Sequence, residues 1–171
     1  MGDALEENAV WSYETPMDPV AGMKDYLALY FNKMEAWYEE DEQIEKHPRS
    51  PEVRVDVLRS SRRVQVLLGG ETLADSTQGR MLFETGHRTR FYLPREDVRM
   101  ELLSPSETQS VCPYKGTATY WHVTVDGKRH PDLVWAYPTP HPESLRIKDL
   151  LCFYEERMDV LVDGEPATPL E

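Results

Sequence analysis

The chain is poor in cysteine and has no long apolar run. Only Cys112 and Cys152 occur among its 171 residues, which is too few for a disulfide scaffold. We therefore expect the reduced setting of the cytoplasm. No apolar run approaches the ~20 residues of a bilayer-spanning helix, and the first thirty residues lack the basic start and apolar core of a signal peptide.

Positive charge is also in short supply. Lys and Arg number 19 against 31 Asp and Glu, for a net charge of −12. A net anion repels a polyanion, so this composition disfavours nonspecific binding to nucleic acid and to anionic membranes. The deficit is uneven: residues 1–51 carry a net −8, residues 52–131 a net +2, and residues 132–171 a net −6.

Nine arginines of the middle segment lie between residues 54 and 99: Arg54, Arg59, Arg62, Arg63, Arg80, Arg88, Arg90, Arg95 and Arg99. Two interpretations stay open. The arginines can be the solvated face of a sheet, or they can form a site for a small anion, because guanidinium forks match carboxylates and phosphates.

Motifs that would name a reaction are missing. The sequence has no Gly-x-Gly-x-x-Gly, no Walker loop and no Gly-x-Ser-x-Gly. Its histidines are scattered, with no pair at the i, i+4 spacing of a helical metal site: His47, His87, His122, His130 and His141. We expect no cofactor and no metal site.

An internal repeat organises the chain. Residues 10–41 align with residues 134–165 without a gap, at a constant offset of 124, and ten of 32 positions are identical. The matches include Val10-Trp11-x-Tyr13-x-Thr15-Pro16, which recurs from Val134 to Pro140. Such self-similarity indicates a duplicated structural unit.

The repeat predicts the domain boundaries. Residues 1–46 are a partial repeat, the tail of a truncated first copy; residues 47–51 are a stiff Pro-containing linker; residues 52–166 are a complete domain; and residues 167–171 are a C-terminal tail. A lone tail cannot bury its aromatic and aliphatic side chains. We therefore expect residues 1–46 to dock on the complete domain or on a second subunit, as in a homodimer or a domain-swapped dimer.

The middle of the chain predicts short antiparallel strands. Alternating Val53, Val55 and Val57 indicate a half-buried strand. The expected strands and turns are a hairpin of 64–68 and 71–74 around Gly69-Gly70, a pair of 81–84 and 89–93, a helical turn at 94–97, strands at 100–103 and 117–125, and a strand 133–137 after Asp126-Gly127.

The repeated tail has two interpretations. In the second copy we expect a helical turn near 145–150 and then two short strands, because Asp163-Gly164 is a hairpin turn. In the first copy, Met23, Leu27, Tyr30, Met34 and Trp37 have helical spacing, so a helix across 23–40 remains an alternative. The whole pattern predicts a mainly β domain.

Several strings resemble the family called domain of unknown function 427. They are Phe83-Glu84-Thr85-Gly86, the run from Phe91 to Val98, Cys112-Pro113-Tyr114-Lys115-Gly116-Thr117-Ala118, the run from Trp135 to Pro140, and the closing Phe153-Tyr154 with Val162 to Glu165. The resemblance covers residues 52–166 in order, and residues 8–42 resemble the last third of a second such domain. The family sometimes carries a nucleotidyltransferase label. This sequence does not support that label, because it lacks a Gly-Ser motif with paired acidic residues at the usual spacing.

The resemblance implies a small β-tent-like domain of two antiparallel sheets with short helical turns. Relatives in that fold class bind zinc through paired Cys-x-x-Cys knuckles. This chain has no such pair, so the resemblance implies a zinc-free version.

The segment Cys112 to Gly116 is the most distinctive. Pro113 and Gly116 predict a tight turn between strands. Lys115 beside the thiol could favour a thiolate, so the candidate catalytic residues are Cys112, Lys115 and Glu84. The alternative is a structural turn with a buried Cys112 and with Lys115 reaching a carboxylate such as Glu84.

The sequence therefore supports two hypotheses. The first is a domain, with or without enzymatic activity, that binds a small polar or anionic metabolite in a pocket of Glu84, Arg90, Tyr92, Cys112, Lys115, Tyr120, Trp135 and Tyr137. Trp135 and Tyr137 share one strand face in it, where they either line that pocket or fill a core. The second is a non-catalytic assembly module that uses the N-terminal repeat fragment.

Overall fold

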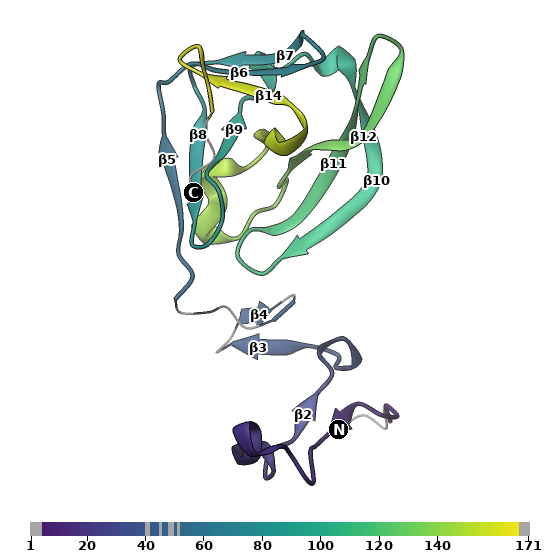
Figure 1. Ribbon diagram of the computed structural model, residues 1–171. Helices are drawn as coiled ribbons and strands as arrows, with labels where there is room; N and C mark the ends of the chain where they lie inside the picture. Colours follow the sequence, from purple (N-terminus) through teal and green to yellow (C-terminus); the bar gives the residue numbers. More distant parts are fainter. Residues whose placement is uncertain (1–4, 40–41, 45, 48–49, 51, 168–171) are drawn as a thin grey trace. The chain divides into compact units, whose positions relative to one another are not determined.

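The computed structural model describes residues 5–39, 42–44, 46–47, 50 and 52–167. They belong to two compact units, unit 1 (residues 1–48) and unit 2 (residues 49–171) (Figure 1). Pro48, Arg49 and Pro51 of the expected linker lie outside the described residues, and so do residues 168–171 of the expected tail.

Unit 2 is built from two antiparallel sheets, which confirms the expected mainly β fold. A seven-stranded sheet has the order β10-β11-β12-β13-β9-β8-β5, and a four-stranded sheet has the order β15-β14-β6-β7. The strands are β5 (Val55–Arg59), β6 (Val64–Leu68), β7 (Glu71–Ser76), β8 (Arg80–Glu84), β9 (Arg90–Leu93), β10 (Leu103–Cys112), β11 (Gly116–Val125), β12 (Lys128–Ala136), β13 (Leu151–Phe153), β14 (Asp159–Val162) and β15 (Glu165–Pro166).

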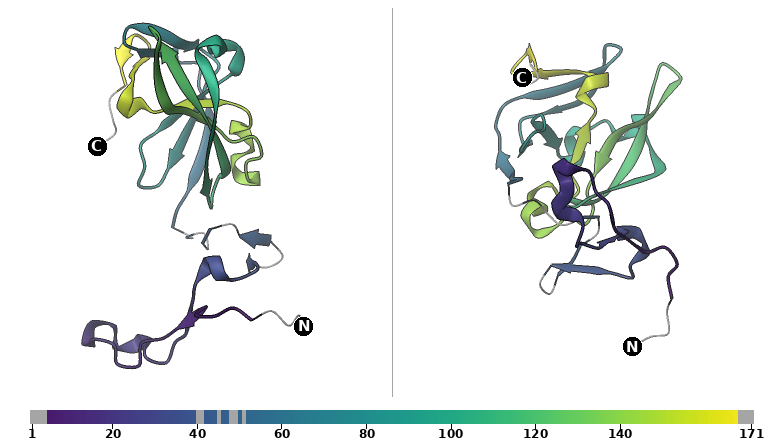
Figure 2. Two further views of the ribbon diagram at one scale, coloured as in Figure 1. Left: turned by 90° about the vertical axis from the view of Figure 1, so that its right-hand side faces the viewer. Right: turned by 60° about the horizontal axis from the view of Figure 1, so that its bottom comes forward.

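The larger sheet is strongly bent. In Figures 1 and 2, β5, β8 and β9 form one flank, β10, β11 and β12 form the other, and β6, β7 and β14 lie across one end of the unit. Tight turns make the hairpins: Gly69 and Gly70 both have positive φ between β6 and β7, as do Asp126 and Gly127 between β11 and β12. That conformation matches the twist of the joined strands.

The helical segments are short 3₁₀ turns. In unit 2 they are η3 (Arg95–Asp97), η4 (Met100–Leu102), η5 (Pro142–Ile147) and η6 (Glu155–Arg157). In the described part of the chain, no helix has the length and apolar character that a membrane crossing needs.

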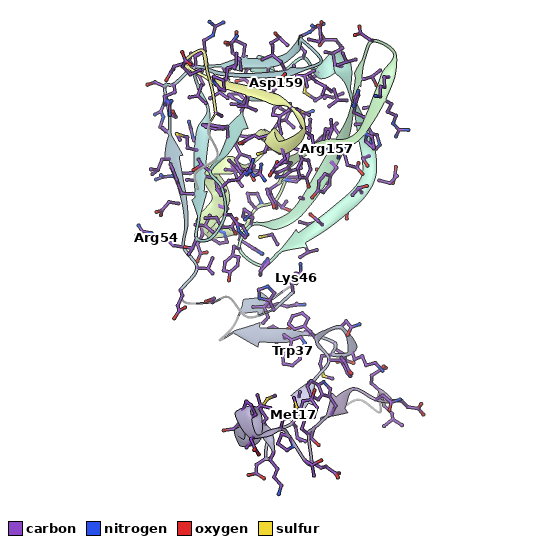
Figure 3. The ribbon with its side chains drawn as sticks, in the orientation of Figure 1. Met17, Trp37, Lys46, Arg54, Arg157 and Asp159 are labelled. Carbon is purple, nitrogen blue, oxygen red and sulfur yellow. The ribbon has the colours of Figure 1, made fainter. Side chains whose placement is uncertain are left out.

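The two faces of the large sheet bury separate apolar clusters. One face packs against the four-stranded sheet and buries side chains such as Val66, Leu93 and Val134. The opposite, concave face buries Leu82, Tyr92 and Trp135 among others. Side chains fill the space between the layers (Figure 3). Alternation along each strand decides which residues reach which face.

Two expected elements of unit 2 have different bounds in the structure. Residues 100–102 form η4, and the strand that was expected there begins at Leu103 and runs ten residues as β10. β10 was missed because it is an edge strand with mostly exposed polar side chains and an irregular register between Pro105 and Gln109, so its apolar alternation is weak. The helical turn expected at 145–150 lies earlier, at η5.

Unit 1 contains short strands and 3₁₀ turns. They are β1 (Val10–Trp11), η1 (Asp18–Met23), β2 (Ala28–Leu29), η2 (Phe31–Lys33), β3 (Trp37–Glu39) and β4 (Glu42–Ile44). The alternative of a helix across 23–40 was wrong. Pairing of Val10 with Leu29 and of Trp11 with Ala28 holds this segment extended, so tertiary pairing overrides the helical spacing.

Backbone pairings of unit 1 recur 124 residues later. The pairs Val10–Leu29 and Trp11–Ala28 correspond to Val134–Phe153 and Trp135–Cys152. η1 corresponds to η5 and η2 to η6 at the same offset. The N–H of Tyr30 donates to the carbonyl of Ala9 at 2.9 Å, as the N–H of Tyr154 does to Leu133 at 3.0 Å. The two segments therefore have the same local backbone pattern over this stretch.

Candidate functional site

The concave face of the large sheet carries a pocket of about 430 Å³, which we call the aromatic pocket. Because β11, β12, β13, β9 and β8 are neighbours in the bent sheet, residues far apart in sequence meet there. The lining residues are Leu82, Glu84, His87, Arg88, Arg90, Tyr92, Lys115, Tyr120, Trp135, Tyr137 and Tyr154.

A buried ion pair lies in the pocket wall. The Lys115 ammonium, from the β10–β11 turn, donates to the Glu84 carboxylate at the end of β8. The two side chains are only 10% and 8% exposed. A buried charge is tolerated only when it is paired, so each of these two groups depends on the other.

The turn that presents Lys115 requires glycine. Gly116 pairs with Cys112 and has φ of +96°. A Cβ at this position would lie 3.0 Å from the carbonyl oxygen of Thr139 and 3.6 Å from Cα of Pro140. The left-handed backbone and the close approach both favour glycine. Gly116 thereby sets the position of Lys115.

Aromatic rings form the rest of the wall. Trp135 contacts Tyr154 at a ring distance of 4.7 Å and meets Tyr92 edge-to-face at 6.4 Å. The indole N–H of Trp135 donates to the Tyr92 hydroxyl at 3.2 Å. Burial raises the pKa values of the Tyr92 and Tyr137 hydroxyls, so both stay neutral hydrogen-bonding groups.

Two arginines give the pocket a positive rim. Arg90 donates to both carboxylate oxygens of Glu156, at 2.6 and 3.0 Å, and its guanidinium lies 5.5 Å from the Trp135 ring centre. Arg88 approaches the same carboxylate at 3.3 Å. The hydrogen bonds from Arg90 hold the pKa of Glu156 at about 2. Three cations and one carboxylate line the pocket, so an excess of positive charge remains after Glu156 is counted.

Seven of the eight residues proposed from the sequence line this pocket: Glu84, Arg90, Tyr92, Lys115, Tyr120, Trp135 and Tyr137. Cys112 is not among them; it is half-buried and packs against the apolar cluster beneath the pocket. Lys115 pairs with Glu84, which is the alternative geometry expected for this turn. Cys152 is fully buried, and burial raises the pKa of its thiol.

Sequence reasoning missed other lining residues: Leu82, His87, Arg88 and Tyr154. Arg88 is one of the nine arginines between residues 54 and 99, and Tyr154 belongs to a string that carries the family resemblance. Leu82 lies two residues before Glu84 on β8, so the side chains of the two residues point to the same face of the sheet. Only the bend of the sheet shows that these side chains converge.

A second hollow, of about 410 Å³, contains the carboxyl group of Glu155. Met81, Phe83 and Phe91 give it an apolar wall. One oxygen of Glu155 is buried and has no hydrogen-bond partner. Burial raises the pKa of Glu155 to about 7. Within the described residues, no group of three His, Cys, Asp or Glu side chains is placed to hold a metal ion.

The fold and the pocket define a small antiparallel β domain with a charged and aromatic concave face. The chain belongs to the family described as Domain of unknown function (DUF427), which it matches over residues 1–40 and 56–164. No curated protein matches the chain.

Proposed function

We propose that unit 2 binds a small organic anion with a flat apolar part in the aromatic pocket. The observation that carries this proposal is the combination of aromatic rings with an excess of guanidinium and ammonium groups in one concave space. Pockets of this size, with mainly apolar walls and a few placed polar groups, are typical small-molecule sites. Arg88 is the expected anchor for the anion, because its contact with Glu156 is longer than that of Arg90.

We propose ligand binding only, without a nucleophilic reaction. Cys112 does not line the pocket, and the charge of Lys115 is directed at Glu84. The tyrosine hydroxyls and the Lys115–Glu84 pair can orient a polar ligand by hydrogen bonds.

Arg88→Gln is expected to weaken ligand binding about tenfold, the size of one lost charge-assisted hydrogen bond. The measurement is titration with benzoate, followed by Trp135 fluorescence in a Trp11→Phe/Trp37→Phe/Trp121→Phe background. The control is Arg63→Gln, which removes the same charge from an arginine paired with Asp75 on β7. Equal weakening by both variants, or no binding of benzoate or any other aromatic carboxylate to the parent protein, would contradict the proposal.

A second candidate function rests on the exposed apolar face of unit 1. Leu27 is 70% exposed, whereas its counterpart Leu151 is fully buried. Leu29 is 45% exposed and its counterpart Phe153 only 2%. In unit 2 the strands β9, β11 and β6 pair with the corresponding segment and cover it. We infer that unit 1, which repeats the pairing pattern of residues 134–153, is an assembly segment for a partner polypeptide that supplies strands equivalent to these three.

A homodimer through unit 1, expected from the sequence, is the less favoured arrangement. A second copy could offer β9 and β11 only by releasing its own residues 134–165, many of which are buried. Light scattering of the full chain over a range of concentrations tests this arrangement, because a swapped dimer would dissociate on dilution.

Placing a second copy of residues 52–133 ahead of the full chain is expected to protect unit 1. The added strands would cover β1 and β2, so hydrogen exchange at Ala28 and Leu29 should slow by at least about a hundredfold. The control carries Leu27→Asp and Leu29→Asp, which should abolish the protection. Exchange that is equally fast with and without the added segment would exclude this mode of assembly.

A further inference from the structure

A basic hollow of about 700 Å³ lies at the ends of β5 and β8, away from the aromatic pocket. It shares no residue with that pocket. It is lined by Arg59, Ser60, Ser61, Thr77, Gln78, Arg80, Pro94, Arg95, Glu96, Arg146, Lys148, Asp149 and Leu150. Five of these side chains are cationic and two are carboxylates, so the hollow has a net charge of +3 in a chain of net −12.

Ion pairing divides the nine arginines between residues 54 and 99 into two groups. Six of them form ion pairs with Asp or Glu: Arg54, Arg62, Arg63, Arg88, Arg90 and Arg99. The other three, Arg59, Arg80 and Arg95, have no carboxylate within 4.0 Å among the described residues, and all three line the basic hollow. Three arginines without an ion-pair partner therefore gather in this hollow, whereas Arg129, which also has no ion pair among the described residues, lies outside it.

Two of these arginines face each other across the sheet. Arg59 of β5 is directly opposite Arg80 of β8. Like charges in that position destabilise a sheet. Such a pair lowers stability unless an anion lies between the two guanidinium groups, so the arrangement favours an anionic ligand.

Backbone carbonyls and an aromatic ring orient several cations of the hollow. These contacts do not neutralise the positive charge of the guanidinium groups. Arg146 donates to the carbonyl of Val57 at 3.0 Å, and Arg95 lies over the Trp121 ring at 5.5 Å. Arg80 contacts the carbonyls of Gln78 and Gly79 at 3.5 and 3.4 Å. Carbonyl and ring contacts orient a cation without neutralising it, and an oriented cation loses less entropy on binding.

We propose that the basic hollow binds a compact anion with two or more phosphate groups. Five cations exceed what one singly charged ligand needs, and arginine forks match phosphate oxygens in pairs. The hydroxyl groups of Ser60, Ser61 and Thr77 add hydrogen-bond donors. No aromatic ring lines the hollow, so recognition depends on charge rather than on stacking.

The experiment is calorimetric titration of the full chain with inorganic tripolyphosphate at 50 and 300 mM NaCl. We expect one site per chain, weaker at the higher salt concentration. Arg59→Gln and Arg80→Gln should each weaken binding about tenfold. Arg54→Gln removes the same charge just ahead of β5, outside the hollow, and should change the affinity less than about twofold (Figure 3).

Thermal unfolding separates a binding role from a structural one. Arg59→Gln removes the like-charge neighbour of Arg80, so its melting temperature without ligand should equal or exceed that of the parent protein. Tripolyphosphate at one fixed concentration should raise the melting temperature of the parent more than that of Arg59→Gln.

Three results would overturn the proposal. They are no binding of tripolyphosphate, equal weakening by Arg54→Gln and Arg59→Gln, and loss of binding in Arg88→Gln, which would place the anion in the aromatic pocket. Tighter binding of a doubly phosphorylated peptide than of tripolyphosphate would overturn the assignment to a compact anion.

Discussion

Lys115→Met is expected to lower the free energy of unfolding of unit 2 by about 3–5 kcal/mol, the usual cost of leaving one partner of a buried ion pair without the other. The remaining Glu84 carboxylate would lie in a wall where both side chains are at most 10% exposed. Urea denaturation measures the change in a Trp11→Phe/Trp37→Phe background, in which the fluorescence comes from Trp121 and Trp135 of unit 2.

The double variant Glu84→Leu/Lys115→Met is the matched control. Replacing both partners with apolar groups of similar volume removes the unpaired charge, so most of the lost stability should return. Arg63→Met breaks a solvent-exposed pair with Asp75 and should cost much less. If Lys115→Met costs no more than Arg63→Met, the Lys115–Glu84 pair is not buried as described.

Glu155→Gln is expected to stabilise unit 2 by about 2 kcal/mol at pH 8 and to have little effect at pH 4, since each pKa unit corresponds to about 1.4 kcal/mol and part of the shift is lost to solvent screening. The pKa of Glu155 is raised from 4.5 to about 7, with burial as the main cause. A raised carboxyl pKa favours the protonated folded state. That stability is fully present below pH 4.5 and is lost as the pH rises through 7.

The charged groups around Glu155 act in opposite directions. Arg90 and Arg88 favour its ionised form, and Glu156 disfavours it. Arg62 and Glu165 line the same hollow. The burial of an unpartnered carboxyl oxygen outweighs the two arginines.

Glu156→Gln is the matched control, because its effect on the free energy of unfolding should change with pH in the opposite direction. Arg90 lowers the pKa of Glu156 to about 2, so Glu156 contributes stability that is present above pH 4.5 and is lost as the pH falls through 2. Urea titrations at pH 3, 4, 6 and 8, each compared with the parent protein at the same pH, should therefore show Glu155→Gln gaining relative stability as the pH rises from 4 to 8 and Glu156→Gln losing it as the pH rises from 3 to 6. Parallel pH profiles for the two variants would refute the assigned environments.

The local turns of unit 2 could be predicted from sequence because their chemistry is local. Gly69-Gly70 and Asp126-Gly127 adopt positive φ whatever surrounds them, so the hairpins followed from the residues alone. β10 could not be predicted in this way. It pairs along one side with β11 and keeps most of its polar side chains exposed, so nothing in its own pattern marks it as a strand.

Sequence reasoning grouped seven of the site residues into one pocket, but it did not find the other residues that line it. Glu84, Lys115 and Trp135 each belong to a distinctive string, and alternation places Trp135 and Tyr137 on one face. Arg88 and Tyr154 carry no local signal that ties them to these residues. Ion pairing likewise separates Arg59 and Arg80 from Arg62 and Arg63, which look the same in the sequence.

By itself the sequence determined the repeat of residues 10–41 at an offset of 124, the strand and turn chemistry of residues 52–166, and the residue types available for binding an anion. Those properties depend on neighbouring residues, side-chain alternation and composition. Only the tertiary structure decided that residues 23–39 are not a helix, that Lys115 pairs with Glu84, and that Arg59, Arg80 and Arg95 gather in one hollow. These outcomes depend on which strands pair in the bent sheet, and the sequence of one strand does not show which other strands it pairs with.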